Sequence, residues 1–320
     1  MSESGLRVQP FEASDAHRWD AFVGEALNGT FLHSRRFLAY HGDRFRDLSL
    51  LFLDERGRLV GLLPAAAGSE PELVDSHPGI TYGGLVHRGD LSGEQALVAL
   101  RAASRHYHEL GYRTLRYRAI PRPYHRRPAE DDSYALFRLD ARRSSVNLSA
   151  AFELAAARTP SELRQRDAKK AGRSGVSVEV KSAAWQEFWS VLEATLETRH
   201  HSKPVHTVSE MLHLAQLFPE EIELVLARID REPVAGTVLF HSGTVTHTQY
   251  LASAPIGRDT GALTRVVEAA IERARERGSA WFSTGTCNED GGRVLNSGLY
   301  RWKLSFGAGG VVHETFDVPL

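Results

Sequence analysis

Two halves of this 320-residue chain carry the same order of predicted elements, and this repeat limits the fold more than any single motif does. In each half, a β-hairpin is followed by a strand, a glycine-containing turn, an amphipathic helix that ends at a glycine, and another strand. The segments are 48–65, 80–86, 92–111 and 114–120 in the first half, and 223–241, 246–252, 262–278 and 281–283 in the second. Identity between the halves is slight, so only the element order repeats. We therefore expect an α/β (α+β) fold with two similar domains, at residues 1–145 and 146–320.

The segments outside the repeat are mostly helical. Residues 19–40 predict two short helices. Between the halves, Thr159 is placed to cap a helix, with Pro160 at the first helical position and Glu162 completing a capping box. The other predicted elements are strands over 134–139 and 176–180 and helices over 185–199 and 208–218.

Composition excludes several classes of protein. Lys and Arg total 39 against 40 Asp and Glu, so contact with nucleic acid must rest on a local patch rather than an overall basic field. The single cysteine, Cys287, excludes an intramolecular disulfide and a Cys-rich zinc site, and no histidine spacing suggests a metal. No apolar run approaches the roughly 20 residues of a membrane span, and the polar N-terminus is unlike a secretory signal. We expect a soluble, cytoplasmic protein without a metal.

The run GGRVLNSGLYRWKLSFGA, from Gly291 to Ala308, is the most specific motif of the chain. It resembles the closing motif of tandem-GNAT proteins related to the Fem peptidoglycan aminoacyltransferases. The basic segment 164–172, followed by the strand at 176–180, resembles the mid-chain basic segment of the same group. The resemblance implies two tandem GNAT-like domains, each a mixed, splayed sheet flanked by helices.

Fem-type enzymes transfer an aminoacyl group from an aminoacyl-tRNA ester to an amine and so form an amide. The resemblance thus implies aminoacyl-tRNA as co-substrate, a small-molecule amine as acceptor and no cofactor, in natural-product or cell-envelope assembly. One alternative is an acyl-CoA-dependent N-acyltransferase acting on an amino sugar or another amine. A second alternative, from another class, is a non-catalytic tandem binding module.

Aminolysis of an ester passes through an oxyanion that the site must stabilise. Lys303 matches the lysine of the closing motif, which implies that role; the alternative is a solvated lysine between its two apolar neighbours. Tyr300, three residues earlier, either donates to the oxyanion or packs. The general base is not readable among His77, His200 and His247. Cys287 has no identifiable base partner, so covalent catalysis is not expected.

Donor binding requires groups that hold phosphate. Arg258 and Gly261 match part of the Q/R-x-x-G-x-G/A loop that receives pyrophosphate in GNAT enzymes, although Leu263 takes the last small position. The alternative is a plain turn before a helix. The basic side chains of the mid-chain helix share one face and form either a phosphate-binding or a solvated surface. They are Arg166, Lys169, Lys170 and Arg173.

Two segments are candidates for the acceptor site. In residues 76–84, His77 and Tyr82 stand beside adjacent glycines, which would let a ligand approach the backbone. Arg199, His200 and Lys203 lie in a predicted connection between helices and would grip the acceptor. The alternatives are a tight connection in the first case and a polar turn in the second.

Overall fold

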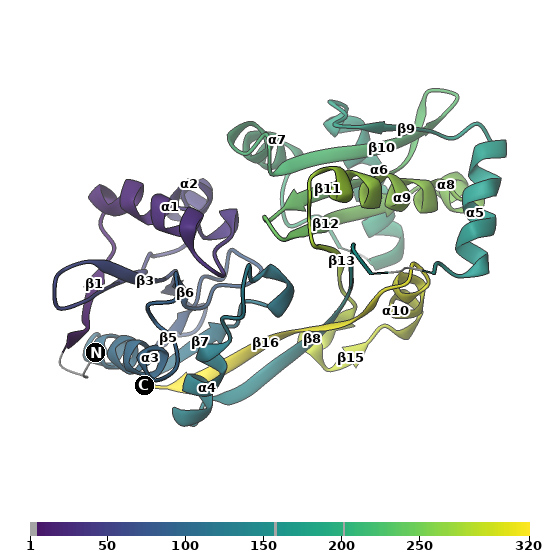
Figure 1. Cartoon of the computed structure of the whole chain (residues 1–320). Coiled ribbons are helices and arrows are strands. Elements are labelled where there is room, and N and C mark those ends of the chain that lie inside the picture. The colour runs from purple at the N-terminus through teal and green to yellow at the C-terminus, as the bar shows by residue number, and fades with distance from the viewer. Residues whose placement is uncertain (1–4, 157–158, 201) are drawn as a thin grey trace. The chain divides into compact units, whose positions relative to one another are not determined.

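The computed structural model describes residues 5–156, 159–200 and 202–320, which form two compact units (Figure 1). The first unit comprises Met1–Leu148, Asn288–Val294 and Val312–Leu320, and the second comprises Ser149–Cys287 and Leu295–Val311. We placed one boundary between residues 145 and 146. The chain returns to the first unit twice near its C-terminus, and the second return contains the end of β16, which pairs with β7.

The first unit is built on two small sheets. One has the strand order β1-β2-β3-β6, and β4, β5, β7 and the end of β16 are neighbours in the other. The bounds are β1 Arg7–Pro10, α1 Ala16–Glu25, α2 Arg35–Leu38, β2 Leu50–Leu53, β3 Leu59–Leu63, β4 Ala66–Ala67, β5 Leu73–Asp75, β6 Val86–His87, α3 Glu94–Glu109, β7 Thr114–Arg118 and α4 Asp131–Arg138. Strands β8 (Arg142–Glu153) and β16 (Gly309–Pro319) contribute residues to both units, and β14 (Asn288–Glu289) pairs with β15 (Val294–Leu295).

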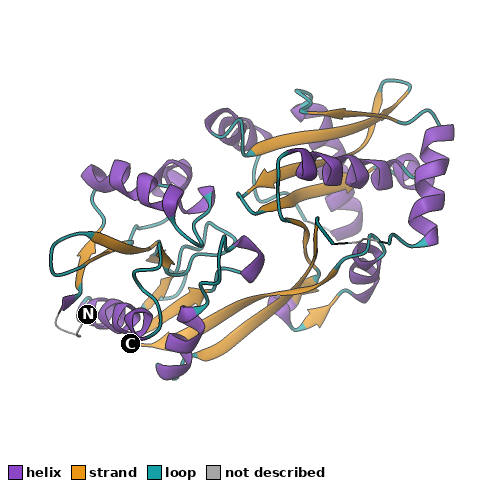
Figure 2. Ribbon diagram, viewed as in Figure 1, coloured by secondary structure: helices purple, strands orange, loops and turns teal. Residues whose placement is uncertain are grey.

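The predicted hairpin of the first half is confirmed, since β2 and β3 pair antiparallel with Leu50 opposite Leu63. Their leucines pack against the apolar face of α3, where Leu97 and Leu100 are buried. The strand predicted over 80–86 is wrong except for its last residue, because residues 76–85 form a loop that Figure 2 shows between β5 and β6.

The strand predicted over 134–139 is also wrong, because residues 134–138 belong to helix α4 and Leu139 is its C-cap. Ala135 and Leu136 are both buried, whereas Tyr134 and Phe137 are exposed. Two adjacent buried positions suit one face of a helix, whereas a half-buried strand buries alternate residues. Two aspartates in the first turn also stabilise a helix start.

The second unit is a sheet of order β8-β13-β12-β11-β10-β9 with helices against it. Its pairs are antiparallel except β12 and β13, which are parallel. The bounds are α5 Glu162–Arg173, β9 Ser177–Val180, α6 Trp185–His200, α7 Val208–Leu217, β10 Ile222–Ile229, β11 Glu232–His241, β12 Val245–Ser253, α8 Pro255–Asp259, α9 Ala262–Glu276, β13 Trp281–Thr286 and α10 Ser297–Leu304. The repeat of the second half is thus present as predicted. Ser161, rather than Thr159, caps α5, because its hydroxyl accepts a hydrogen bond from the Arg164 N–H.

The parallel pair gives the sheet its splayed form. Its register runs from Val245 opposite Trp281 to His247 opposite Ser283, and β12 then continues to Ser253. The two faces of the sheet carry different helices. On one face, α9 buries Val266, Val267, Ala270, Ile271 and Ala274. On the other lies α6, whose Phe188 would be 2.6 Å from a Cβ added at Gly236 of β11.

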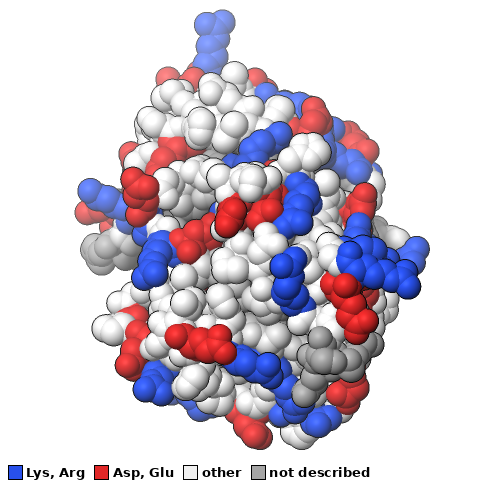
Figure 3. Space-filling model, turned by 90° about the vertical axis from the view of Figure 1, so that its left-hand side faces the viewer, with Lys and Arg blue, Asp and Glu red and all other residues white. Residues whose placement is uncertain are grey.

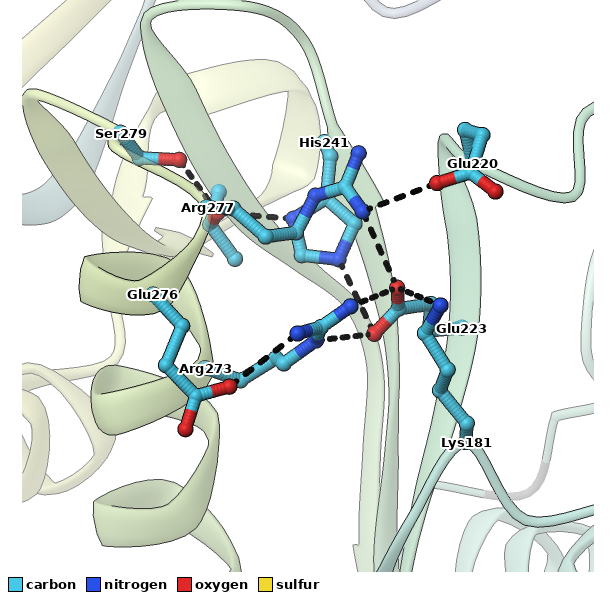
Figure 4. A network of polar contacts seen from close by, with 9 residues as sticks. Lys181, Glu220, Glu223, His241, Arg273, Glu276, Arg277 and Ser279 are labelled. Carbon is cyan, nitrogen blue, oxygen red and sulfur yellow. Dashed lines mark hydrogen bonds and ion pairs between the residues drawn. The ribbon is translucent and has the colours of Figure 1, made fainter.

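The C-terminal end of α9 is fixed to the sheet by a buried carboxylate (Figure 4). The Glu223 side chain of β10 is 2% exposed and accepts two hydrogen bonds of 2.8 Å from Arg273 of α9. Arg277 donates a third at 3.3 Å, and the His241 ring lies 3.6 Å away. Burial alone would raise the pKa of Glu223, but the hydrogen bonds from Arg273 and His241 hold it well below its usual value. This ion cluster holds α9 in place and thereby positions its opposite end.

Candidate active site

A cavity of about 530 Å³ lies in the second unit where β12 ends and α9 begins. Its walls come from the end of β12, the loop into α9, and helices α5, α6 and α10. We call it the donor cavity. The residues lining it are Arg164, Asp167, Thr195, Leu251, Ala252, Ser253, Arg258, Gly261, Leu263, Thr264, Asn296, Gly298, Leu299 and Trp302.

The loop into α9, which comprises the short helix α8 and the turn after it up to Gly261, depends on glycine at two positions. Gly261 has a φ of +82°, and a Cβ added there would lie 2.3 Å from the carbonyl oxygen of Asp167 in α5. A Cβ added at Gly257 would lie 2.2 Å from the Val234 oxygen. Both glycines are therefore required by backbone packing and, at Gly261, by a left-handed conformation. The Arg258 side chain closes the loop by donating to the Ser253 carbonyl at 2.6 Å.

The donor cavity is lined by two guanidinium groups, those of Arg258 and Arg164. Arg164 is 8% exposed, donates to the Thr264 hydroxyl at 3.0 Å, and pairs with Asp167 at 3.0 Å. Its Nε is buried without a hydrogen-bond partner. The start of α9, which carries the positive end of the helix dipole, lines the same cavity. These three features attract an anion such as phosphate, although the Asp167 carboxylate, which also lines the cavity, offsets part of the Arg164 charge.

Helix α5 presents two different faces. Arg164 and Asp167 face the donor cavity, whereas the four basic residues predicted to bind the donor are exposed: Arg166, Lys169, Lys170 and Arg173. Arg164 begins the basic segment 164–172, but the sequence pattern assigns it no separate role. Its distinct position follows from residue spacing, because Arg164, Asp167 and the buried Ala171 lie at i, i+3 and i+7 and so share one face of the helix.

Lys303 of α10 is buried, only 6% exposed, and its side chain lies against the end of β13. Its Nζ donates to the carbonyl oxygens of Gly285 and Thr286, each at 2.9 Å, and contacts the Cys287 thiol. Burial lowers the pKa of Lys303 and raises that of Cys287, and the contact between them opposes both shifts. An ammonium has three donors, so two are taken by carbonyl groups and one remains for another acceptor.

The predicted partner of Lys303, Tyr300, lies three residues earlier in α10 and is half-buried. This spacing places both on one side of the helix, which the sequence alone did not establish. Leu299 and Trp302, offset by one residue, line the donor cavity instead.

His247, one of the three histidines considered as a base, lies beside this lysine. Its Nδ1 is 3.2 Å from the Ser283 hydroxyl, which is 3.4 Å from that of Ser149. A Cβ added at Gly285 would be within 4 Å of both the His247 ring and the Lys303 Nζ. The two serines were not identified from the sequence, because their contact requires β8 and β13 to pair.

The two acceptor candidates of the first unit are core residues. His77 packs against His41 and Phe45 with ring centroids 5.2 and 5.4 Å away, and burial lowers its pKa to about 3. Tyr82 is 2% exposed and packs against Tyr124 with the rings tilted and their centroids 4.5 Å apart. At the neighbouring Gly83, a Cβ would collide with the Ser76 oxygen, so backbone packing within the protein accounts for this glycine.

The remaining acceptor candidates lie near the end of α6. Lys203 is exposed in the connection to α7. The side chains of Arg199 and His200 lie outside the described part of the chain, so their proposed role stays a prediction.

Surface charge is mixed, as the composition predicts. On the face drawn in Figure 3, basic and acidic side chains are interspersed. Among the described residues, no helix combines the length and apolarity required to cross a membrane. The same residues contain no group of three or more His, Cys, Asp or Glu side chains that could hold a metal ion.

Comparison with known proteins identifies the domain and the fold. Residues 157–304 match the family described as acetyltransferase (GNAT) domain. A comparison with curated protein sequences finds no match. Among solved structures, the crystal structure of FemX is 13% identical with a TM-score of 0.70, over 98% of this chain and 97% of that chain.

Two further structures have the same fold. L-PGS from Bacillus licheniformis is 14% identical with a TM-score of 0.61, over 94% of this chain and 91% of that chain. A tandem GNAT protein from the clavulanic acid biosynthesis pathway is 13% identical with a TM-score of 0.53, over 98% of both chains. Residues 157–304 thus match a GNAT acetyltransferase domain, and the chain as a whole has the fold of FemX and of the tandem GNAT protein, which supports an acyltransferase.

Proposed function

We propose that the enzyme transfers an aminoacyl group from aminoacyl-tRNA to the amine of a small-molecule acceptor. The observation that carries this proposal is the donor cavity, where the buried Arg164, Arg258 and the start of α9 converge. A nucleotide-linked donor brings a phosphate that fits this site. The fold that the chain shares with FemX supports an aminoacyl donor.

In the proposed reaction, the amine nitrogen attacks the ester carbonyl carbon and its oxygen becomes an oxyanion. The third N–H of Lys303 stabilises this oxyanion, exchanging its contact with the Cys287 thiol for the developing charge. His247 accepts the amine proton, held in position by Ser283 and Ser149. The oxyanion then re-forms the carbonyl as the ester C–O bond breaks, and the ribose oxygen leaves with the proton that His247 held.

A second donor class is an acyl-CoA thioester. The match to the acetyltransferase (GNAT) domain favours it, and the loop from Arg258 to Gly261 would receive its pyrophosphate. Leu263, which lines the donor cavity where GNAT enzymes have a small residue, argues for a different donor. The chemistry at the carbonyl is the same in both cases.

One experiment separates the two donors. The purified protein is incubated with mixed aminoacyl-tRNAs or mixed acyl-CoAs and a pool of small amines, and amide products are identified by mass spectrometry. The proposal expects a product from aminoacyl-tRNA that disappears when the tRNA is digested with RNase beforehand. A product that survives RNase and requires acyl-CoA would replace it with the second donor. The absence of any product would favour a binding module.

A further inference from the structure

A second cavity, of about 500 Å³, adjoins the donor cavity in the same unit. Thr195 of α6 and Arg258 of α8 line both cavities. The remaining walls are one face of α6 and the residues around the β10–β11 turn. We call it the side cavity. A donor held by Arg258 can therefore extend from one cavity into the other.

The lining of the side cavity is apolar with acceptor groups at its edges. Val191, Pro233 and Pro255 supply apolar surface. Glu187 and Glu232 supply carboxylates, and the hydrogen bond from Arg228, 2.5 Å long, lowers the pKa of Glu187 and keeps it ionised.

Two hydroxyl groups on α6 add further acceptors. Ser190 donates its hydrogen to the Gln186 carbonyl at 3.1 Å, and Thr198 donates to the Ala194 carbonyl at 2.7 Å. Their oxygen lone pairs remain to accept. Carboxylates repel an anion, so away from Arg258 this lining fits a flat, neutral group that carries N–H donors.

We propose that the side cavity binds the adenine base of the donor, an inference that rests on the proposed nucleotide-linked donor. The 3′-terminal adenosine of tRNA and the adenosine of coenzyme A both present this base next to a phosphate. Arg258, at the junction, holds the phosphate, and the exocyclic amino group donates to a carboxylate such as Glu232. The proline and valine surfaces contact the faces of the ring.

The test fills the side cavity and compares donors with and without the base. Ala194 is an exposed α6 residue that lines the cavity, so Ala194→Trp blocks it without disturbing the core. Glu193→Trp, at the adjacent exposed position, adds the same side chain in a different direction and is the matched control. The probes are coenzyme A, 4′-phosphopantetheine, and RNA minihelices ending in CCA or in CC with an abasic last nucleotide, and binding is measured by calorimetry.

If the enzyme uses tRNA, Ala194→Trp weakens the CCA minihelix about tenfold or more and leaves the abasic minihelix unchanged. If it uses coenzyme A, the same loss is seen for coenzyme A and not for 4′-phosphopantetheine. Glu193→Trp binds every probe like the wild type.

Two results would overturn the inference. In the first, a donor binds the wild type, and Ala194→Trp either binds it equally well or loses affinity for the base-free probe to the same extent. The adenine then lies elsewhere, and the proposed function stands. If neither donor binds the wild type, the proposed function and the adenine site fail together.

Discussion

Replacing Gly261 by alanine perturbs the donor loop in a way that the structure quantifies. The residue has a φ of +82°, and an L-residue in the left-handed region costs about 1–2 kcal/mol. The new Cβ would also lie 2.3 Å from the Asp167 oxygen, so the backbones of the loop and α5 must move apart. Overpacking of this kind costs about 1–3 kcal/mol more. The expected total is about 2–5 kcal/mol.

Gly278, at the other end of α9, provides a matched control. Its φ is +72°, but a Cβ added there meets no atom within 4 Å. Gly278→Ala therefore has the conformational cost alone, about 1–2 kcal/mol. The contrast between the two variants isolates the contact between the loop and α5.

The assay is urea unfolding followed by tryptophan fluorescence, together with titration of the donor identified by the product assay. We expect Gly261→Ala to lose more unfolding free energy than Gly278→Ala and to lose donor affinity, because movement of α5 displaces Arg164. Gly278→Ala should bind the donor normally. Equal losses of stability, or unchanged donor binding in Gly261→Ala, would refute the packing argument.

Three further variants test separate features. Glu223→Gln should lower the free energy of unfolding by about 3–5 kcal/mol at neutral pH, because it leaves two arginines without their buried carboxylate. The pKa of Glu223 is lowered in the folded state, so its contribution to stability is present above about pH 4.5 and is lost on further acidification. The difference between variant and wild type in urea unfolding should therefore shrink toward pH 3. Arg164→Met should weaken donor binding at least about tenfold, whereas Arg166→Met, at an exposed position of the same helix, should not; equal effects would argue against the donor cavity. Cys287→Ser should keep its turnover within about threefold, and a complete loss would show that the thiol takes part in the reaction.

The sequence predicted the elements of the second unit well because their signals are local. The hairpin over 223–241 consists of two apolar runs joined by a short polar turn, the helix over 262–278 has helical periodicity and ends at a glycine, and both are present. The prediction of a strand over 134–139 failed because six residues with mixed apolar positions fit a strand as well as a helix. Only the burial of Ala135 beside Leu136 decides between them.

The site was less predictable, because side chains from distant segments form it. Gly261 and Arg258 were identified from the loop pattern, and both line the donor cavity. Arg164 was given no role because its position depends on a contact between distant segments, its hydrogen bond to Thr264 of α9. The last strand joins the first unit through pairing with β7, and no local signal encodes that partner.

The most direct test of the proposed mechanism is single-turnover amide formation by Lys303→Met, with the donor and acceptor that the product assay identifies. Far-UV circular dichroism and donor titration first establish that the variant is folded and binds its donor. The account predicts that the rate falls by about 10²–10³ while affinity for the acyl donor stays within about threefold, because the N–H group that the variant lacks acts on the oxyanion. A folded, donor-binding variant that forms the amide at the wild-type rate would contradict it and leave Lys303 as a tie between α10 and the end of β13.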